Sequence, residues 1–370
     1  MSSRRPLRVA LVAPSLRILG GQAVQAQRLL DAWRHDPDID PWLVPINPVP
    51  PAPFDRLLDI KYVRTVLTQL LYYPLLVREL RRADVVHVFS ASYASFLLAP
   101  LPAILIARVL GKPVVLNYRS GEAPDHLKRS AIARWALRTV DLNVVPSSFL
   151  RDVFATFGLR SRIVANVCDL ERFEYRERDP LRPRLLSTRN FDALYNLPCT
   201  LRAFARVQAR HADASLTLVG SGSGEPALRQ LVSELRLRHV TFAGRVPQHE
   251  IHRFYADADI YIQTPSIDNM PASVIEAFAS GLPVVATRVG GVPAILEDGV
   301  HGLLAPDDDA NAVADHVLAL LDDPAAARRM TAAARASCGN YEWAVLRDQW
   351  VDVYRSLTAR AGHASLAEAA

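Results

Sequence analysis

The chain has 370 residues, and at roughly 150 residues per domain it holds two or three domains, each with a sizeable core. Half of the residues are apolar, 22% are charged and 8% are aromatic, which excludes a disordered or collagen-like protein. The net charge of +5 is uneven, because residues 1–175 hold 23 Lys and Arg against 15 Asp and Glu, whereas residues 176–370 hold 20 against 23. The basic half is expected to face an anionic partner. We favour anionic lipid or a phosphate-bearing substrate over nucleic acid, because the sequence has no zinc finger, RNA-recognition signature or lysine-rich arm.

The sequence indicates a cytoplasmic location. Cys168, Cys199 and Cys338 form no CxxC pair, so neither a disulfide framework nor a cysteine-built zinc site is suggested. The N-terminus carries Arg4 and Arg5 but lacks a signal-peptide cleavage site. Residues 88–107 are uncharged, yet their serines, prolines and β-like start favour a buried strand, a loop and a buried helix over a membrane span.

Short apolar runs alternate with helix-like segments along most of the chain, which is typical of βαβ units and parallel sheets. The first half predicts strands at 9–13, 42–46, 85–89, 114–118, 142–145 and 163–165, with helices between them. The second half predicts strands at 184–188, 215–219, 240–243, 259–263 and 283–286. Its helices are expected at 199–210, 225–236, 248–256 and 272–280, followed by three more.

Between the two series, residues 171–183 are rich in charge and contain two prolines, which marks a linker. We therefore predict an α/β protein of two Rossmann-like domains, residues 1–170 and 184–340, with a C-terminal helix and tail over 341–370. Their ligand is expected outside the carboxyl ends of the strands, in a cleft between the two facing domains.

Residues 57–82 mix leucines with lysine and arginine, so this segment could be a basic amphipathic helix that lies on a membrane. We favour the alternative of a core-facing helix with solvated arginines, interrupted near Pro74.

Two glycine loops offer backbone N–H groups to an anionic ligand. Gly20 and Gly21 open a helix with no acidic residue in its first two turns, and Gly220 begins a glycine-rich loop after a strand. A plain turn is the alternative for each loop, and the dinucleotide pattern GxGxxG is absent after Gly20.

A third segment, residues 264–283, is more informative. Asp268 falls in the loop before a helix, and Glu276 lies within that helix among apolar neighbours, where a carboxylate is costly to bury without a partner. Ligand hydroxyl groups would supply the partner, and an internal amide or arginine is the alternative.

Together these segments resemble the retaining nucleotide-sugar glycosyltransferases of family 4, which have the two-domain GT-B fold. The resemblance covers nearly the whole chain. Besides the glycine loops and residues 266–283, it rests on residues 84–88, 145–152, 166–173, 218–222 and 242–247. It implies that the last helix, from residue 341, crosses back to the N-terminal domain.

The resemblance assigns donor-site roles to the segment around the two carboxylates. It implies that Glu276 holds the ribose hydroxyls of the donor nucleotide and that Asp268, a glutamate in the family pattern, lies beside the donor sugar. Backbone groups around Asn269, Met270 and Pro271 would meet sugar or phosphate, although Pro271 itself has no N–H.

Arg189 matches the family arginine that binds the donor diphosphate, and its planar fork suits phosphate oxygens. The family lysine about five residues further on is missing, because Leu194 and Tyr195 stand there. Backbone groups of the segment Gly244, Arg245 and Val246 resemble those that read the nucleotide base.

On the acceptor side, Arg119 stands where the family commonly has a histidine. Arginine can stabilise phosphate or a sugar hydroxyl, but it cannot act as a general base near neutral pH. His87, Tyr118 and Glu122 are the acceptor-side candidates, although a histidine on a buried strand is more often structural.

The resemblance implies transfer of a sugar from a nucleoside diphosphate sugar, with UDP and GDP favoured, to a glycan, lipid-linked or small-molecule acceptor with retention at the anomeric carbon. Arg189 would stabilise the leaving diphosphate, Asp268 and Arg119 would complete the catalytic set, and neither a metal nor another cofactor is expected. The basic N-terminal half of the chain is also compatible with peripheral contact of the protein with the inner face of an anionic membrane. Two alternatives stay open: a catalytically weakened homologue that binds nucleotide sugar or scaffolds a glycan assembly complex, and a sugar-nucleotide epimerase.

Overall fold

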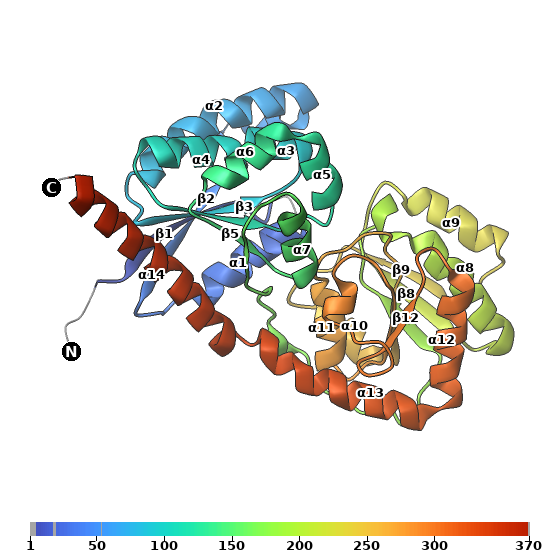
Figure 1. Ribbon diagram of the computed structural model, residues 1–370. Coiled ribbons are helices and arrows are strands. Elements are labelled where there is room, and N and C mark those ends of the chain that lie inside the picture. Colours follow the sequence, from blue (N-terminus) through green and yellow to red (C-terminus); the bar gives the residue numbers. More distant parts are fainter. Residues whose placement is uncertain (1–4, 18–19, 53, 369–370) are drawn as a thin grey trace. The chain divides into compact units, whose positions relative to one another are not determined.

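The computed structural model describes residues 5–17, 20–52 and 54–368, so Arg4 of the N-terminal segment lies outside the described residues. The chain forms two compact units, one of residues 1–167 and 343–370 and the other of residues 168–342. Each unit contains a parallel six-stranded sheet with helices on both faces (Figure 1). The predicted α/β class with two Rossmann-like domains is confirmed.

The strands of the first unit follow the order β2-β1-β3-β4-β5-β6 across its sheet. They are β1 (Leu7–Ala13), β2 (Ile39–Pro45), β3 (Val85–Ser90), β4 (Val114–Tyr118), β5 (Leu142–Val145) and β6 (Arg162–Ile163). The helices are α1 (Gly21–Ala32), η1 (Phe54–Asp59), α2 (Lys61–Leu80), α3 (Tyr93–Leu98), α4 (Pro100–Val109), α5 (Ala123–Arg129), α6 (Ala131–Thr139), α7 (Ser148–Thr156) and α14 (Trp343–Glu368).

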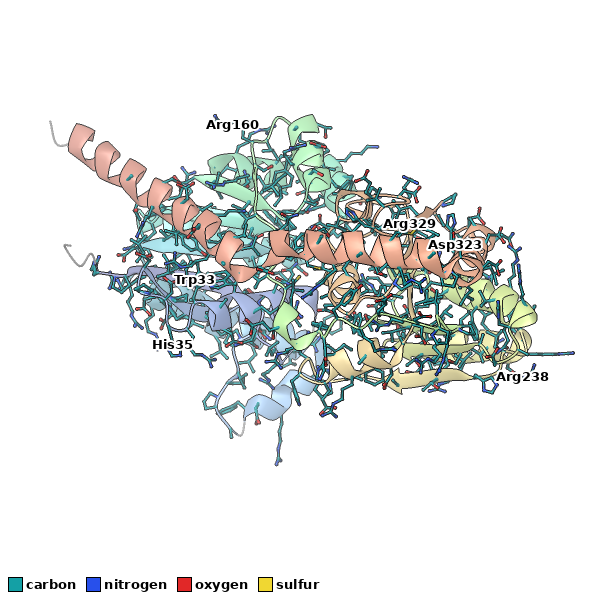
Figure 2. All side chains as sticks on the ribbon, turned by 90° about the horizontal axis from the view of Figure 1, so that it is seen from below. Trp33, His35, Arg160, Arg238, Asp323 and Arg329 are labelled. Carbon is teal, nitrogen blue, oxygen red and sulfur yellow. The ribbon has the colours of Figure 1, made fainter. Side chains whose placement is uncertain are left out.

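Two separate apolar layers cover the two faces of this sheet. The buried sides of α2, α4, α6 and α7 pack on one face, and α1 and α14 pack on the other (Figure 1). Trp33, just after α1, lies beside the C-terminal helix, with its ring edge-on to Trp343 at a centroid distance of 4.6 Å (Figure 2). Arg347 of α14 adds ion pairs to Asp36 at 2.5 Å and Asp38 at 2.6 Å. The last helix is therefore an integral layer of the first unit.

The second unit has the strand order β12-β11-β10-β7-β8-β9. Its strands are β7 (Arg184–Ser187), β8 (Ser215–Val219), β9 (Val240–Gly244), β10 (Ile260–Gln263), β11 (Val284–Thr287) and β12 (Leu303–Ala305). Its α-helices are α8 (Leu197–Arg210), α9 (Glu225–Glu234), α10 (Ile251–Asp257), α11 (Ala272–Ala279), α12 (Ala310–Asp322) and α13 (Pro324–Ser337). Short 3-10 turns are η2 (Leu170–Arg172), η3 (Ala193–Tyr195), η4 (Val292–Ala294) and η5 (Cys338–Tyr341).

The segment over residues 171–183 packs against the second unit. The Arg178 side chain is buried and donates hydrogen bonds to the carbonyl oxygens of Tyr255, at 2.8 Å, and Ala258, at 3.3 Å. Burial lowers the pKa of Arg178 to about 10. Carbonyl oxygens thus hold a guanidinium that would otherwise be costly to bury.

Several local expectations differ from the structure. Helix α2 runs through Pro74 without a break, because Pro74 is on the exposed side and the carbonyl that loses its N–H partner can bond to water. Strand β6 ends at Ile163, two residues before the expected end, and β12 was missed because three residues give no readable alternation. Residues 88–107 form the end of β3 and two short helices, and no described helix is long and apolar enough to cross a membrane.

Candidate active site

Several sequence-predicted residues meet at one edge of the second sheet. Because all of its strands are parallel, the segments that follow β7, β8, β9 and β10 emerge at the same edge. Arg189 follows β7, Gly220 follows β8, Arg245 follows β9, and the loop with Asp268 follows β10. This edge is the candidate donor site.

Arg189 lies at the centre of this edge and is held by three side chains. Its guanidinium donates to Asp268 at 2.6 Å and to the Ser273 hydroxyl at 3.2 Å, and it stacks over the Tyr195 ring at 4.1 Å. Burial acts to lower the pKa of Arg189, but the charge of Asp268 and the nearby tyrosines outweigh it and raise the pKa above its usual value. Arg189 is therefore a fixed, permanently charged group, as phosphate binding requires.

Glu276 is 6% exposed and sits in the middle of α11. Its Oε2 accepts a hydrogen bond from the Tyr255 hydroxyl at 3.0 Å, and that hydroxyl lies 2.8 Å from Oγ1 of Thr188. Burial, together with the charge of Glu276, raises the pKa of Tyr255 well above its usual value, so the phenol stays a neutral donor. An ionised carboxylate has about four acceptor sites, so Glu276 can also accept hydrogen bonds from ligand hydroxyls.

The glycine loop after β8 packs closely against the backbone of Arg189 and the residues that follow it. A Cβ on Gly220 would collide with the carbonyl oxygen of Arg189, and one on Gly222 would come within 2.8 Å of the Phe191 backbone. The Gly220 N–H donates to the Gly244 carbonyl at 2.9 Å, which ties this loop to the end of β9. Only glycine lets these loops approach so closely.

The loop before α11 is largely buried, and part of its hydrogen bonding is made within the loop itself. Asn269 and Met270 are each 5% exposed, and Pro271 is the N-cap of α11. The backbone N–H of Asn269 donates to Oδ1 of Asp268 at 2.8 Å, so in this structure it is committed to that carboxylate. Asp268 thus links Arg189 to its own loop.

At the end of β9, Gly244 has a φ of 70°, in the left-handed region that favours glycine. Arg245 is exposed and Val246 is half-buried. The chain turns here beside the Gly220 loop. That this segment reads the nucleotide base stays a prediction.

In the first unit, the carboxyl ends of β1, β3 and β4 carry the other candidates. Gly20 is the N-cap of α1, whose first turn has no acidic residue, and neither Gly20 nor Gly21 has a heavy atom within 4 Å of a Cβ position. Gln22 donates to the Ser90 carbonyl at 3.0 Å and so fixes the helix start to the end of β3.

Arg119, just after β4, packs within the first unit. Its guanidinium lies over the Phe89 ring at 5.3 Å and donates to the side-chain oxygen of Asn166. These contacts hold a permanent positive charge at the carboxyl edge of this sheet.

Tyr118 is fully buried and belongs to a polar network that the sequence did not reveal. Its hydroxyl lies 2.9 Å from the Ser92 hydroxyl and 2.8 Å from Nδ1 of His126. Burial lowers the pKa of His126 below its usual value, which outweighs the opposite effect of the nearby Asp125. Glu122 is exposed at the start of the same helix, α5.

Tyr93 stands next to this network with a φ of 55°, which is rare for a residue with a side chain. Its hydroxyl donates to Asp125 at 2.7 Å, and its ring lies 5.3 Å from that of His126. Helices α3 and α5, which follow β3 and β4 in the chain, thus bring a tyrosine, a histidine and a carboxylate together.

His87 lies away from this edge, in the interior of the first unit. It is fully buried, with Nδ1 at 2.8 Å from the Tyr354 hydroxyl of α14 and Nε2 at 3.2 Å from the Asn117 amide nitrogen. Burial lowers its pKa to about 3. These contacts favour the structural alternative for His87.

Across residues 5–17, 20–52 and 54–368, no group of three or more His, Cys, Asp and Glu residues is placed to hold a metal ion.

Two family descriptions match the chain. "Glycosyltransferase Family 4" matches residues 19–172, and "Glycosyl transferases group 1" matches residues 171–337. The chain belongs to glycosyltransferase family 4, whose members are nucleotide-sugar glycosyltransferases with the GT-B fold.

The chain is also similar in sequence to individual glycosyltransferases. The sulfoquinovosyl transferase SQD2 of Arabidopsis thaliana is 25% identical over 78% of this chain and 60% of that protein. A GDP-mannose-dependent phosphatidylinositol monomannoside mannosyltransferase of Mycolicibacterium smegmatis is 31% identical over 40% of each protein. The chain therefore spans less than two thirds of the length of these relatives.

Among solved structures, HepE of Anabaena in complex with UDP-glucose matches 95% of this chain and 100% of that chain. The TM-score is 0.74 and the sequence identity is 17%, so this likeness concerns the fold.

Proposed function

We propose that this chain is a retaining glycosyltransferase that moves a sugar from a nucleoside diphosphate sugar, with UDP or GDP as the favoured nucleotide, to a glycan or lipid-linked acceptor. The observation that carries the proposal is Arg189, whose side chain is 11% exposed and is fixed by Asp268, Ser273 and Tyr195, at the same carboxyl edge of the second sheet as the buried Glu276. A fixed guanidinium next to a buried carboxylate fits a ligand with phosphates at one end and hydroxyls at the other.

In this proposal the second unit binds the donor. Arg189 contacts the diphosphate, Glu276 accepts hydrogen bonds from the ribose, and the end of β9 faces the base. As the glycosidic bond to phosphate breaks, negative charge grows on the leaving diphosphate, and Arg189 is already in place to stabilise it. The leaving phosphate accepts the proton of the acceptor hydroxyl, so no side-chain base is required at this step.

The first unit binds the acceptor. Arg119 provides a positive charge, and helices α3 and α5, with Tyr93, Asp125 and His126, provide hydrogen-bonding groups. The acceptor is proposed to be glycan or lipid-linked because the mannosyltransferase relative is named for a phosphatidylinositol substrate. The enzyme then works in the cytoplasm at the inner face of a membrane.

The test is turnover. The protein is incubated with labelled UDP- and GDP-sugars and with lipid and glycan extracts, and both nucleoside diphosphate release and the labelled product are measured. Label in an acceptor, lost in Glu276→Gln but kept in the exposed control Glu234→Gln, supports the transferase. Free sugar formed without acceptor supports the epimerase instead, and donor binding without release supports the weakened homologue.

A further inference from the structure

The exposed apolar side chains of this protein are concentrated on one part of the first unit. Fourteen of the twenty large apolar side chains recorded as exposed among the described residues lie between Phe54 and Trp135, and three lie in the whole second unit. On the surface of a soluble protein such residues normally occur singly, so their concentration here indicates an interaction surface.

Except for Tyr93, which belongs to the network around His126, these side chains lie on one helical layer formed by η1, α2, α3, α4 and α6. On α2, the exposed Val63, Val66, Leu70 and Tyr73 recur every three or four residues, whereas the side that packs on the sheet carries Tyr72, Leu76 and Leu80. Helix α4 packs beside α2 and beside α6, and all three cover the same face of the sheet (Figure 1). Their outward sides therefore form one surface.

The neighbouring helices continue the apolar face. Leu97 and Leu98 are exposed on α3, Leu105 and Val109 on α4, and Ile132 and Trp135 on α6. Val109 is 87% exposed and Trp135 is 50% exposed, although both are side chains that water solvates poorly. We call the outward side of η1, α2, α3, α4 and α6 the apolar layer surface.

The part of the chain that carries this surface has a basic composition. Residues 54–139 contain thirteen Lys and Arg against six Asp and Glu. Glu79, 6% exposed, is already paired with Arg78 and Arg82 and so adds no acidic character to the surface. Arg64 on α2, Arg81 at the C-cap of α2 and Arg108 on α4 are exposed on the same helices as the apolar side chains.

We propose that the apolar layer surface docks onto a lipid bilayer that contains anionic phospholipids. Apolar side chains that enter the headgroup region, bordered by arginines that attract anionic headgroups, form the pattern of an interfacial anchor. Tyr62, Tyr73 and Trp135 add the amphipathic rings that favour this boundary. The inference rests on the proposed function only in placing the lipid-linked acceptor at the same membrane.

Sedimentation with vesicles tests the inference directly. Vesicles of phosphatidylcholine alone are compared with vesicles of equal parts phosphatidylcholine and phosphatidylglycerol, in the absence of donor. We expect binding to the anionic vesicles, weakened on the order of tenfold in the combined Val66→Ser, Leu70→Ser, Trp135→Ser variant. Arg64→Gln and Arg81→Gln are each expected to weaken it about fivefold.

The controls separate a membrane effect from a folding effect. Val300→Ser and Arg202→Gln place matched changes on the exposed surface of the second unit and are expected to leave vesicle binding unchanged. Because every substitution is at an exposed position, the melting temperature should stay close to that of the wild type.

Three outcomes overturn the inference: equal binding to both vesicle types, no loss in the surface variants, or a concentration-dependent dimer that the Val66, Leu70 and Trp135 changes abolish. The dimer would show that a second copy occupies the surface. If the protein binds vesicles but no nucleotide, the proposed function is contradicted, whereas the inference of membrane docking is still supported.

Discussion

Arg189 is held by side chains both near and distant in sequence: Tyr195 is close by in the chain, and Asp268 and Ser273 are far along it. Tyr195 stands near the place where the family has a lysine, and its ring packs on the guanidinium at 4.1 Å. The aromatic ring of Tyr195 orients the guanidinium of Arg189. The family lysine would instead add a second positive charge. We therefore read Tyr195 as a positioning residue for Arg189.

Replacing Tyr195 tests that reading. Tyr195→Ala is expected to weaken nucleoside diphosphate binding about fivefold, because a cation–π contact contributes about 1 kcal/mol. Tyr195→Phe keeps the ring and is expected to bind as the wild type does. The neighbouring control, Leu194→Ala, is also expected to bind as the wild type does. Calorimetric titration checks this, and equal weakening in Tyr195→Phe would contradict the role of the ring.

Gly220 makes a second residue-scale prediction. Because a Cβ there would collide with the Arg189 carbonyl, Gly220→Ala is expected to destabilise the protein by about 3 kcal/mol. The matched change Gly339→Ala meets nothing within 4 Å and is expected to cost less than about 1 kcal/mol. Denaturant unfolding measures both, and equal stabilities would show that the close approach is not required.

At the scale of elements, much was readable from local sequence. Strands such as β4, β5 and β8 are short apolar runs between polar or turn residues, and the structure has them at the expected bounds. Glu276 was placed within a helix by its apolar neighbours and helix punctuation. Its partner Tyr255 comes from α10, and only the packing of α10 against α11 brings the two together.

The docking of α14 on the first sheet predicts a pH effect. His87 is neutral and buried with a pKa of about 3, whereas the unfolded chain takes up a proton near pH 6.5. The unfolded state then binds more protons below pH 6.5, so stability falls as pH falls.

Between pH 7 and pH 5 this single group is expected to remove about 2 kcal/mol from the free energy of unfolding. His87→Gln should lose that part of the pH dependence, whereas the exposed control His249→Gln should keep it. Denaturant unfolding at both pH values measures this, and an identical slope in His87→Gln would contradict the burial argument.

On the scale of the whole molecule, the two units divide chemistry and charge. The N-terminal half carries the excess of basic residues and the apolar layer surface, and the second unit carries the Arg189 and Glu276 edge. The charge asymmetry was visible in the sequence, and a membrane-facing helix over residues 57–82 was one of two alternatives there. The sequence could not decide between them, because periodicity does not say which apolar side of a helix is left exposed in the folded chain. Exposure in the folded chain decides that.

The central claim is that the edge with Arg189 and Glu276 binds a nucleoside diphosphate sugar. It is tested most directly by melting the wild type and Glu276→Gln with UDP, GDP, ADP, CMP and their sugars, since a ligand that binds only the folded state raises the melting temperature. The account predicts a rise with one nucleotide class, UDP or GDP, that disappears in Glu276→Gln. No rise with any of these ligands, or the same rise in the variant, would contradict it.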